Sequence, residues 1–304
     1  MGPGADDEPF GTTTAPGPPF PLGERMRIRA TVAAVSGALV LSAFAVPAAQ
    51  AADATSGKAT FSSATAAGTA TAAATLDVTF SSVKVNAGKA VVVPATGSVK
   101  FSITYKVTHA ASLKSSDFDT IPVIYHGTDI KSSEYGVAPD DLPTCTDTSA
   151  TVENCKATLS ASHEDMVNSI AGTWQAGAIA FDQDGNPTFG NNLGKVSVQR
   201  LSKLTVNAAP EPVKKGKTIT VTGNLTRANW DAKKYSGYST QPVKLQFRKK
   251  GASTYTTVKT IKTSSTGALK TTVKATVDGY FRYSFAGTAT TPAVNATGDY
   301  VDVK

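Results

Sequence analysis

The chain is poor in the residue types from which most active sites are built. Its 304 residues include only three His, three Met and two Cys. The histidines His109, His126 and His163 lie in separate segments, and no H-E-x-x-H motif joins any two of them. The spacing of the two cysteines fits no zinc knuckle. This scarcity disfavours a metal cluster and also a nucleophile with its own base.

The motifs of the common enzyme classes are missing as well. The sequence contains no G-x-S-x-G, no P-loop and no G-x-G-x-x-G after a strand-like segment. Residues 81–84, SSVK, match S-x-x-K, but they lie in a strand-like segment where that motif needs the start of a helix. We therefore expect a protein that is not an enzyme and has no cofactor, unless it binds calcium weakly.

Long hydrophobic runs are rare, and the clearest one has the form of an export signal. Arginines at positions 25, 27 and 29 precede an apolar run at 30–51 that ends in Ala-Gln-Ala. A basic start, an apolar centre and a small-residue cleavage site define a secretory signal peptide. Pro47 interrupts the end of the run, so its apolar core is shorter than the roughly 20 apolar residues that a spanning helix needs. We predict a signal peptide at 26–51 and a secreted product without a membrane span.

Two neighbouring segments have little to bury. Residues 1–25 are rich in Pro and Gly and precede Met26, which opens a signal of ordinary form, so we interpret them as a gene-model extension. Residues 52–75 are a low-complexity Ala/Thr/Ser tract. Because almost no large apolar side chain is present, we expect this linker to stay disordered.

From residue 76 onward the sequence changes to short alternating segments. Thr and Val are abundant, and both favour half-buried, pleated surfaces. Apolar residues recur two apart at 76–85, 98–107 and 121–127, and residues 171–201 have the form of two strands around a turn. Several short strands with regular turn signals predict a β-sandwich over residues 76–203.

The C-terminal third repeats this pattern with six strand-like segments, at 216–225, 241–250, 253–261, 268–277, 279–287 and 298–304. Phe281, Tyr283 and Phe285 are expected to point to one face of their strand. The sequence therefore predicts an all-β fold: two immunoglobulin-like β-sandwich domains in tandem, at 76–203 and 204–304. Residues 208–216 contain two prolines and are predicted to form the hinge between them.

Cys145 and Cys155 lie in the exported part of the chain. Exported cysteine pairs are expected to be oxidised, and closing so short a loop stabilises a domain by about 3 kcal/mol. We predict a structural disulfide that ties residues 145–155 into a hairpin-like excursion.

The segments GKTITVTGNL, PVKLQFRKKG and GYFRYSFAGTATTPAVNATGDYVDV resemble immunoglobulin-like modules of secreted actinobacterial proteins. Together with VQRLSKLTVNA and the two-cysteine region, the mature chain is similar to a family of secreted streptomycete proteins, some of which carry a calcium-binding label. The resemblance implies an extracellular β-sandwich protein and supplies no catalytic residues.

Residues 181–187, FDQDGNP, are the strongest candidate for a metal site. Asp182, Asp184 and Asn186 match the first three ligand positions of an EF-type calcium loop. The glycine and the bidentate glutamate of that loop are replaced by Pro187 and Leu193. Asp, Asn and Gly also favour tight turns, so a hairpin turn is the preferred interpretation. A weak calcium site remains compatible with it.

Charge divides unevenly between the two predicted domains. Residues 52–203 carry a net charge of −3, whereas residues 204–304 contain 16 Lys and Arg against five Asp and Glu, a net charge of +11. Such asymmetry attracts anionic polymers, although it could also serve only to keep the exterior hydrated. The contact residues that we predict are Lys214, Lys215, Lys217, Arg248, Lys249 and Lys250.

No recognition helix or platform of aromatic and basic residues is evident in the sequence, so we expect no sequence-specific nucleic-acid binding. The sequence thus favours a secreted, monomeric, non-catalytic binding or scaffold protein of the extracellular or cell-wall space. Its partner would be an anionic cell-wall polymer. The alternative is an extracellular calcium-binding protein.

Overall fold

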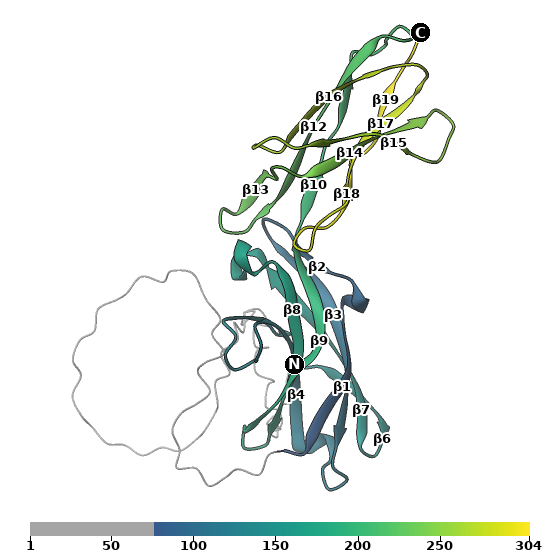
Figure 1. Ribbon diagram of the computed structural model, residues 1–304. Coiled ribbons are helices and arrows are strands. Elements are labelled where there is room, and N and C mark those ends of the chain that lie inside the picture. Colours follow the sequence, from purple (N-terminus) through teal and green to yellow (C-terminus); the bar gives the residue numbers. More distant parts are fainter. Residues whose placement is uncertain (1–75) are drawn as a thin grey trace, which may run out of the picture.

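The computed structural model describes residues 76–304, and these form two β-sandwich domains arranged end to end (Figure 1). The prediction of an all-β fold with two immunoglobulin-like domains in tandem is confirmed for this part of the chain. The predictions for residues 1–25, 26–51 and 52–75 lie outside the described residues. Within residues 76–304, no helix has the length and apolar character needed to cross a membrane.

The first domain consists of two packed sheets. One sheet has the order β1 (Val78–Val85), β3 (Ser98–His109), β7 (Val152–Ser162) and β6 (Thr144–Ser149). The other has the order β2 (Val91–Val93), β9 (Pro187–Arg200), β8 (Gly172–Asp182), β4 (Phe118–His126) and β5 (Tyr135–Val137). Four single-turn 3-10 segments complete the domain: η2 (Asn86–Gly88), η3 (Ser115–Asp117), η4 (His163–Asp165) and η5 (Asn168–Ile170).

Alternation along the central strands builds the core of this domain. In β3 the side chains of Phe101, Ile103, Tyr105 and Val107 are all buried, as the period of two predicts. Each such side chain contributes roughly 1.5–3 kcal/mol of hydrophobic free energy. Strand β7 was not expected over its whole length, because its inward positions include two alanines, which give a weak hydrophobic signal.

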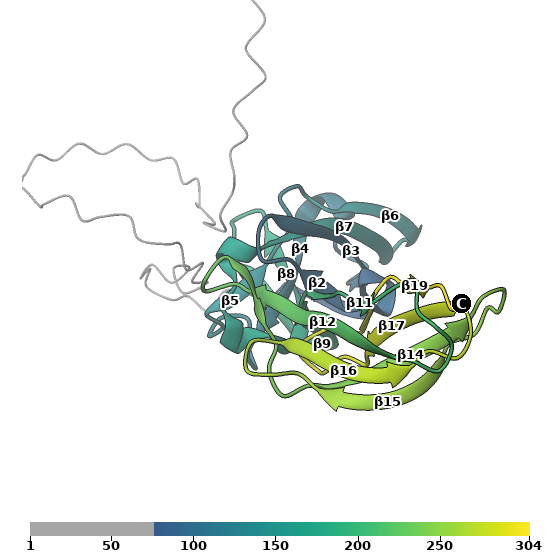
Figure 2. The ribbon, with the colours of Figure 1, turned by 90° about the horizontal axis from the view of Figure 1, so that it is seen from above.

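The second domain also has two sheets. In one, β12 (Thr218–Asn229) is the centre and pairs with β10 (Ser202–Leu204), β11 (Asn207–Ala209), β13 (Lys234–Gly237) and β16 (Ala268–Lys274). The other contains β15 (Thr256–Lys262), β14 (Pro242–Lys249), β17 (Gly279–Phe285), β18 (Val294–Asn295) and β19 (Asp299–Val301). Figure 2 shows these two sheets in a view down the long axis, with β15 next to β16. Phe281, Tyr283 and Phe285 are buried between the sheets, as predicted.

The two domains share part of one core. Trp230, in the turn that follows β12, is only 1% exposed and packs with the buried residues of the first domain. Its indole N–H donates to the carbonyls of Val93 (3.3 Å) and Pro94 (3.1 Å), and its backbone N–H donates to the side chain of Asn168 (3.0 Å). Buried Arg200 adds a hydrogen bond from Nε to the carbonyl of Ala228 (2.6 Å). The junction is therefore packed and hydrogen-bonded.

The predicted hinge at 208–216 is wrong. Its first residues belong to β11, which pairs with β12, and Val213 bridges to Val303 within the second domain. The chain passes between the domains at Leu201, directly between β9 and β10. The two prolines suggested a linker, but they lie in a connection inside the second sandwich.

Candidate functional site

Two of the basic turns that the sequence singled out meet at the end of the second domain that lies away from the junction. Strand β12 begins at Thr218, next to the turn at 214–217, and ends at Asn229 beside the first domain. A strand of this length spans roughly 35–40 Å. The backbone N–H of Lys215 donates to the carbonyl of Lys304 (2.7 Å), and that of Lys250 donates to the carbonyl of Asp278 (2.9 Å). The first bond holds the turn at 214–217 against the C-terminal residue, and the second holds Lys250 against the turn that precedes β17.

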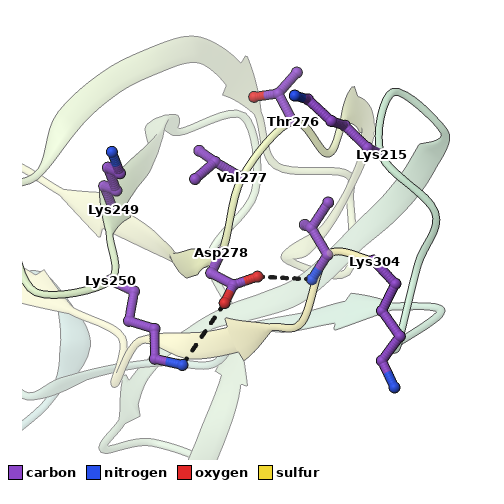
Figure 3. A pocket seen from close by; sticks show the side chains of 8 residues that line it. Lys215, Lys249, Lys250, Thr276, Val277, Asp278 and Lys304 are labelled. Atoms are coloured by element: carbon purple, nitrogen blue, oxygen red, sulfur yellow. Dashed lines mark hydrogen bonds and ion pairs between the residues drawn. The ribbon is translucent and has the colours of Figure 1, made fainter.

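The turns line an open pocket of about 390 Å³, which we call the lysine pocket (Figure 3). Its lining residues are Lys215, Lys249, Lys250, Thr276, Val277, Asp278, Val303 and Lys304. All four lysines are exposed. Gly216 makes the turn beside Lys215 possible, because its φ of 80° lies in the left-handed region that favours glycine.

Asp278 organises one side of the lysine pocket. Its carboxylate accepts hydrogen bonds from the backbone N–H of Val303 (2.9 Å) and from the hydroxyl of Tyr300 (3.1 Å). Lys250 donates to the same hydroxyl (3.2 Å) and lies 3.6 Å from Asp278. The Val303 N–H is the main cause of a lowered pKa for Asp278, and the Tyr300 hydroxyl is the main cause of a raised pKa for Lys250. Both groups therefore stay ionised at neutral pH.

The positive charges of the remaining lysines of the pocket are less neutralised by carboxylates than the charge of Lys250. Lys304 lies 3.7 Å from Asp302, an exposed ion pair of small energetic value. Among the ion pairs of residues 76–304, none involves Lys215 or Lys249. Two lysines that line the pocket thus carry ammonium groups outside these ion pairs, each with three donors, and Lys250 is fixed beside them. Such a site can attract an anion without any covalent chemistry.

The predicted contact residues divide into those inside and those outside the pocket. Lys215, Lys249 and Lys250 line the cavity, whereas Lys214 and Lys217 lie in the same turn without lining it. Arg248 lies on the outer face of its sheet, with its guanidinium 4.4 Å from the ring centroid of Tyr280.

Asp278, Tyr300 and Lys304 were missed in the sequence. The expected strand order could have indicated them. In an antiparallel sandwich the start of one strand and the end of its neighbour lie at the same end, so residues at such positions come close to the basic turns.

The candidate calcium residues form a hairpin turn between β8 and β9. One oxygen of Asp182 accepts from the backbone N–H groups of Asp184 (3.0 Å) and Asn186 (2.7 Å), and the other accepts from the Asn186 side chain (2.8 Å). Slight burial acts to raise the pKa of Asp182, but these hydrogen bonds outweigh it and lower the pKa. Both carboxylate oxygens of Asp182 are thus already engaged within the turn. The calcium site stays a prediction.

Cys145 and Cys155 form the predicted disulfide, which joins directly opposed residues of β6 and β7. Together with Glu153 they are the one trio of His, Cys, Asp or Glu residues in the described part of the chain whose ligand atoms gather within 4.8 Å. Because the two sulfurs are bonded to each other, they are not free to bind a metal, and the disulfide serves as a structural staple. Disulfides of this kind persist in oxidising, extracellular environments.

The three histidines each have separate structural contacts. His109 is buried beside Glu153, with 3.8 Å between Nε2 and the nearer carboxylate oxygen. His163 makes a hydrogen bond of 3.0 Å to the carbonyl of Gly97. The ring of His126 lies 5.9 Å from that of Trp174. The structure does not bring these three side chains into one site.

The fold and the pocket define a two-domain, immunoglobulin-like β-sandwich protein with a basic end. No protein-family model and no curated protein matches the chain. Solved structures that resemble it include adhesin InvE of Yersinia pseudotuberculosis, with 14% identity over 74% of this chain and 58% of that chain and a TM-score of 0.24. The D00–D0 domain of intimin shows 14% identity over 72% of this chain and 98% of that chain, with a TM-score of 0.24. A 1.5-MDa bacterial ice-binding adhesin shows 12% identity over 76% and 66%, with a TM-score of 0.24. These sequence identities and TM-scores are too low to support a functional argument, so the function is inferred from the side chains of this chain.

Proposed function

We propose that this chain is a secreted, non-catalytic binding protein that holds an anionic polymer of the cell wall in its lysine pocket. The observation that carries the proposal is the convergence of four lysines from three separate segments on one cavity. Within residues 76–304, the carboxylates that pair with them are those of Asp278 and Asp302. The rest of the charge attracts anions from solution.

The architecture supports this role in two ways. The disulfide fits an oxidising compartment outside the cytoplasm. The packed junction holds the pocket at the far end of an elongated molecule, away from the first domain (Figure 1). A polymer can therefore reach the pocket without displacing the first domain.

Charge reversal of the two unpaired lysines tests the proposal. Lys215→Glu with Lys249→Glu should weaken binding of the secreted protein to isolated cell walls by about tenfold or more, because each reversal replaces an attraction by a repulsion of roughly 1 kcal/mol or less at an exposed site. Sedimentation of protein with walls measures the bound fraction. Binding should also fall with salt, because the Debye length shrinks from about 8 Å at physiological ionic strength to about 3 Å at 1 M.

Lys233→Glu with Lys234→Glu is the matched control. Lys233 ends the turn next to the junction and Lys234 begins β13; both are exposed, so the control changes net charge equally at the opposite end of the domain. Its wall binding should stay near that of the wild type. If both double variants lose binding equally, net charge alone acts and the lysine pocket is not the site.

A further inference from the structure

The outer face of the sheet formed by β14, β15 and β17 carries charge of one sign. These three strands contain six Lys and Arg and no Asp or Glu. Alternation directs Gln246 and Arg248 of β14, and Tyr280 and Arg282 of β17, away from the buried core. The register places Arg248 opposite Tyr280 and Gln246 opposite Arg282.

Tyrosine rings and guanidinium groups alternate across this face. The guanidinium of Arg282 lies 3.8 Å from the ring centroid of Tyr255, and that of Arg248 lies 5.2 Å from Tyr255 and 4.4 Å from Tyr280. Tyr280 in turn contacts Tyr300, with 5.2 Å between centroids. We call Arg282, Tyr255, Arg248, Tyr280 and Tyr300 the Arg–Tyr row. No sequence motif indicates this row, because its members come from four separate segments.

The Arg–Tyr row is continuous with the lysine pocket. Tyr300 is its last member, and the hydroxyl of Tyr300 accepts a hydrogen bond from Lys250 of the pocket. One extended polymer could therefore contact the pocket and the row together.

Both guanidinium groups are fixed in place but not neutralised. Arg248 donates from Nη1 to the carbonyl of Ala252 (2.6 Å), and Arg282 donates from Nε to the side-chain oxygen of Gln246 (2.8 Å). Among the ion pairs of residues 76–304, none involves either arginine. An arginine has five N–H donors arranged to match a carboxylate in two-point contact. Most of these donors remain for a ligand.

The form of the row indicates which kind of polymer fits. Proteins that bind single-stranded nucleic acid offer open ring faces for base stacking, whereas here a guanidinium lies over Tyr255 and another over Tyr280. The rings of Tyr280 and Tyr300 are tilted by 52°, so they form no flat stack. The groups that the row offers to a ligand are therefore planar guanidinium cations that alternate with tyrosine hydroxyl groups.

We infer that the polymer is an acidic polysaccharide whose carboxylates are separated by hydroxyl-bearing rings, a polyuronate. Its carboxylates would bind the in-plane donors of Arg248 and Arg282, and its hydroxyls would bind the tyrosine hydroxyls and Gln246. The inference rests on the proposed function, because the same polymer would continue into the lysine pocket.

Binding of four probes to the full mature chain tests the inference: polygalacturonate, its methyl-esterified form, polyphosphate and oligo-deoxythymidine. Polygalacturonate should bind more tightly than the uncharged ester and than oligo-deoxythymidine. Arg248→Lys with Arg282→Lys keeps the charge but removes the planar fork. It should weaken polygalacturonate binding about tenfold, the effect of losing one good charged hydrogen bond or two weaker ones. Polyphosphate binding should change little, because the lysine pocket is intact.

Arg227→Lys is the matched control. Arg227 also stacks on a tyrosine, with 3.8 Å to the Tyr238 ring centroid, but it bonds to Thr291 near the junction. The Arg227→Lys variant should bind polygalacturonate as tightly as the wild type does. Tyr280→Phe removes only a hydroxyl from the row and should weaken polygalacturonate binding severalfold, the size expected for one neutral hydrogen bond. The Tyr280→Phe variant keeps the test decisive if the double arginine variant proves too unstable to measure.

The outcomes separate the two proposals. If Lys215→Glu with Lys249→Glu abolishes polyanion binding but the row variants bind polygalacturonate normally, the pocket stands and the polyuronate inference is overturned. Tighter binding of oligo-deoxythymidine than of polygalacturonate also overturns it. If the wild type binds none of the polyanions, both proposals fail.

Discussion

At the scale of single residues, Asp182 shows how one motif can suit two structures. Calcium needs carboxylate oxygens that are free to bind it, but both oxygens of Asp182 accept hydrogen bonds within the turn. Gly185, with a φ of 82°, completes the reversal of the chain. The same Asp, Asn and Gly residues that suggest a calcium loop are therefore sufficient to close a hairpin.

Calorimetric titration of the wild-type protein should show little or no calcium binding below about 1 mM, the weak end of the range for extracellular modules. Asp182→Ala with Asp184→Ala should leave that result unchanged. It should lower the free energy of unfolding by about 1 kcal/mol, because hydrogen bonds within an exposed turn are lost. Asp140→Ala with Asp141→Ala removes the same charge elsewhere in the first domain and is the control. A micromolar signal that the double change at 182 and 184 abolishes would restore the calcium-binding alternative.

At the scale of elements, β6 depends on its disulfide. All six of its residues, Thr144–Ser149, are exposed, so no apolar burial attaches the strand to the domain. It lies at the edge of its sheet and pairs with β7 alone. The bond between Cys145 and Cys155 is its one covalent tie, and Cys155 itself is buried.

Cys145→Ser with Cys155→Ser should lower the free energy of unfolding by about 3 kcal/mol, the chain-entropy value for so short a loop. Amide hydrogen exchange should accelerate most in β6, because the strand then detaches first. Thr146→Ala, at the neighbouring exposed position, should change neither quantity measurably. Labelling of free thiols in the native wild-type protein should find none; two reactive thiols per chain would contradict the staple.

At the scale of the whole molecule, the shared core makes the two domains one mechanical unit. Trp230 comes from the second domain and is buried in the first, and Asn168 of the first domain also donates from its backbone N–H to Asp231 (3.0 Å). Unfolding of either domain would expose this indole. We therefore expect the two domains to unfold together.

Trp230→Ala should lower the free energy of unfolding by about 3–5 kcal/mol, because it leaves a large cavity in the core. It should also split the calorimetric transition into two, one for each domain. Lys233→Ala, in the same turn but exposed, should retain a single transition near the wild-type midpoint. If the wild type already melts in two steps, or the tryptophan variant still melts in one, the domains are not coupled through Trp230.

The sequence by itself determined the all-β class, the two sandwiches, the inward faces of strands such as β3 and β17, and the disulfide. These features follow from local periodicity and from one pair of cysteines. Only the tertiary structure decided where the chain crosses between domains, that Trp230 belongs to the core of the other domain, and that distant basic turns meet with Asp278, Tyr300 and Lys304 in one pocket. The Arg–Tyr row likewise exists only after folding. The physical reason is that strand periodicity sets which way a side chain faces, whereas its neighbours on a sheet face or at a strand end are set by pairing between distant segments.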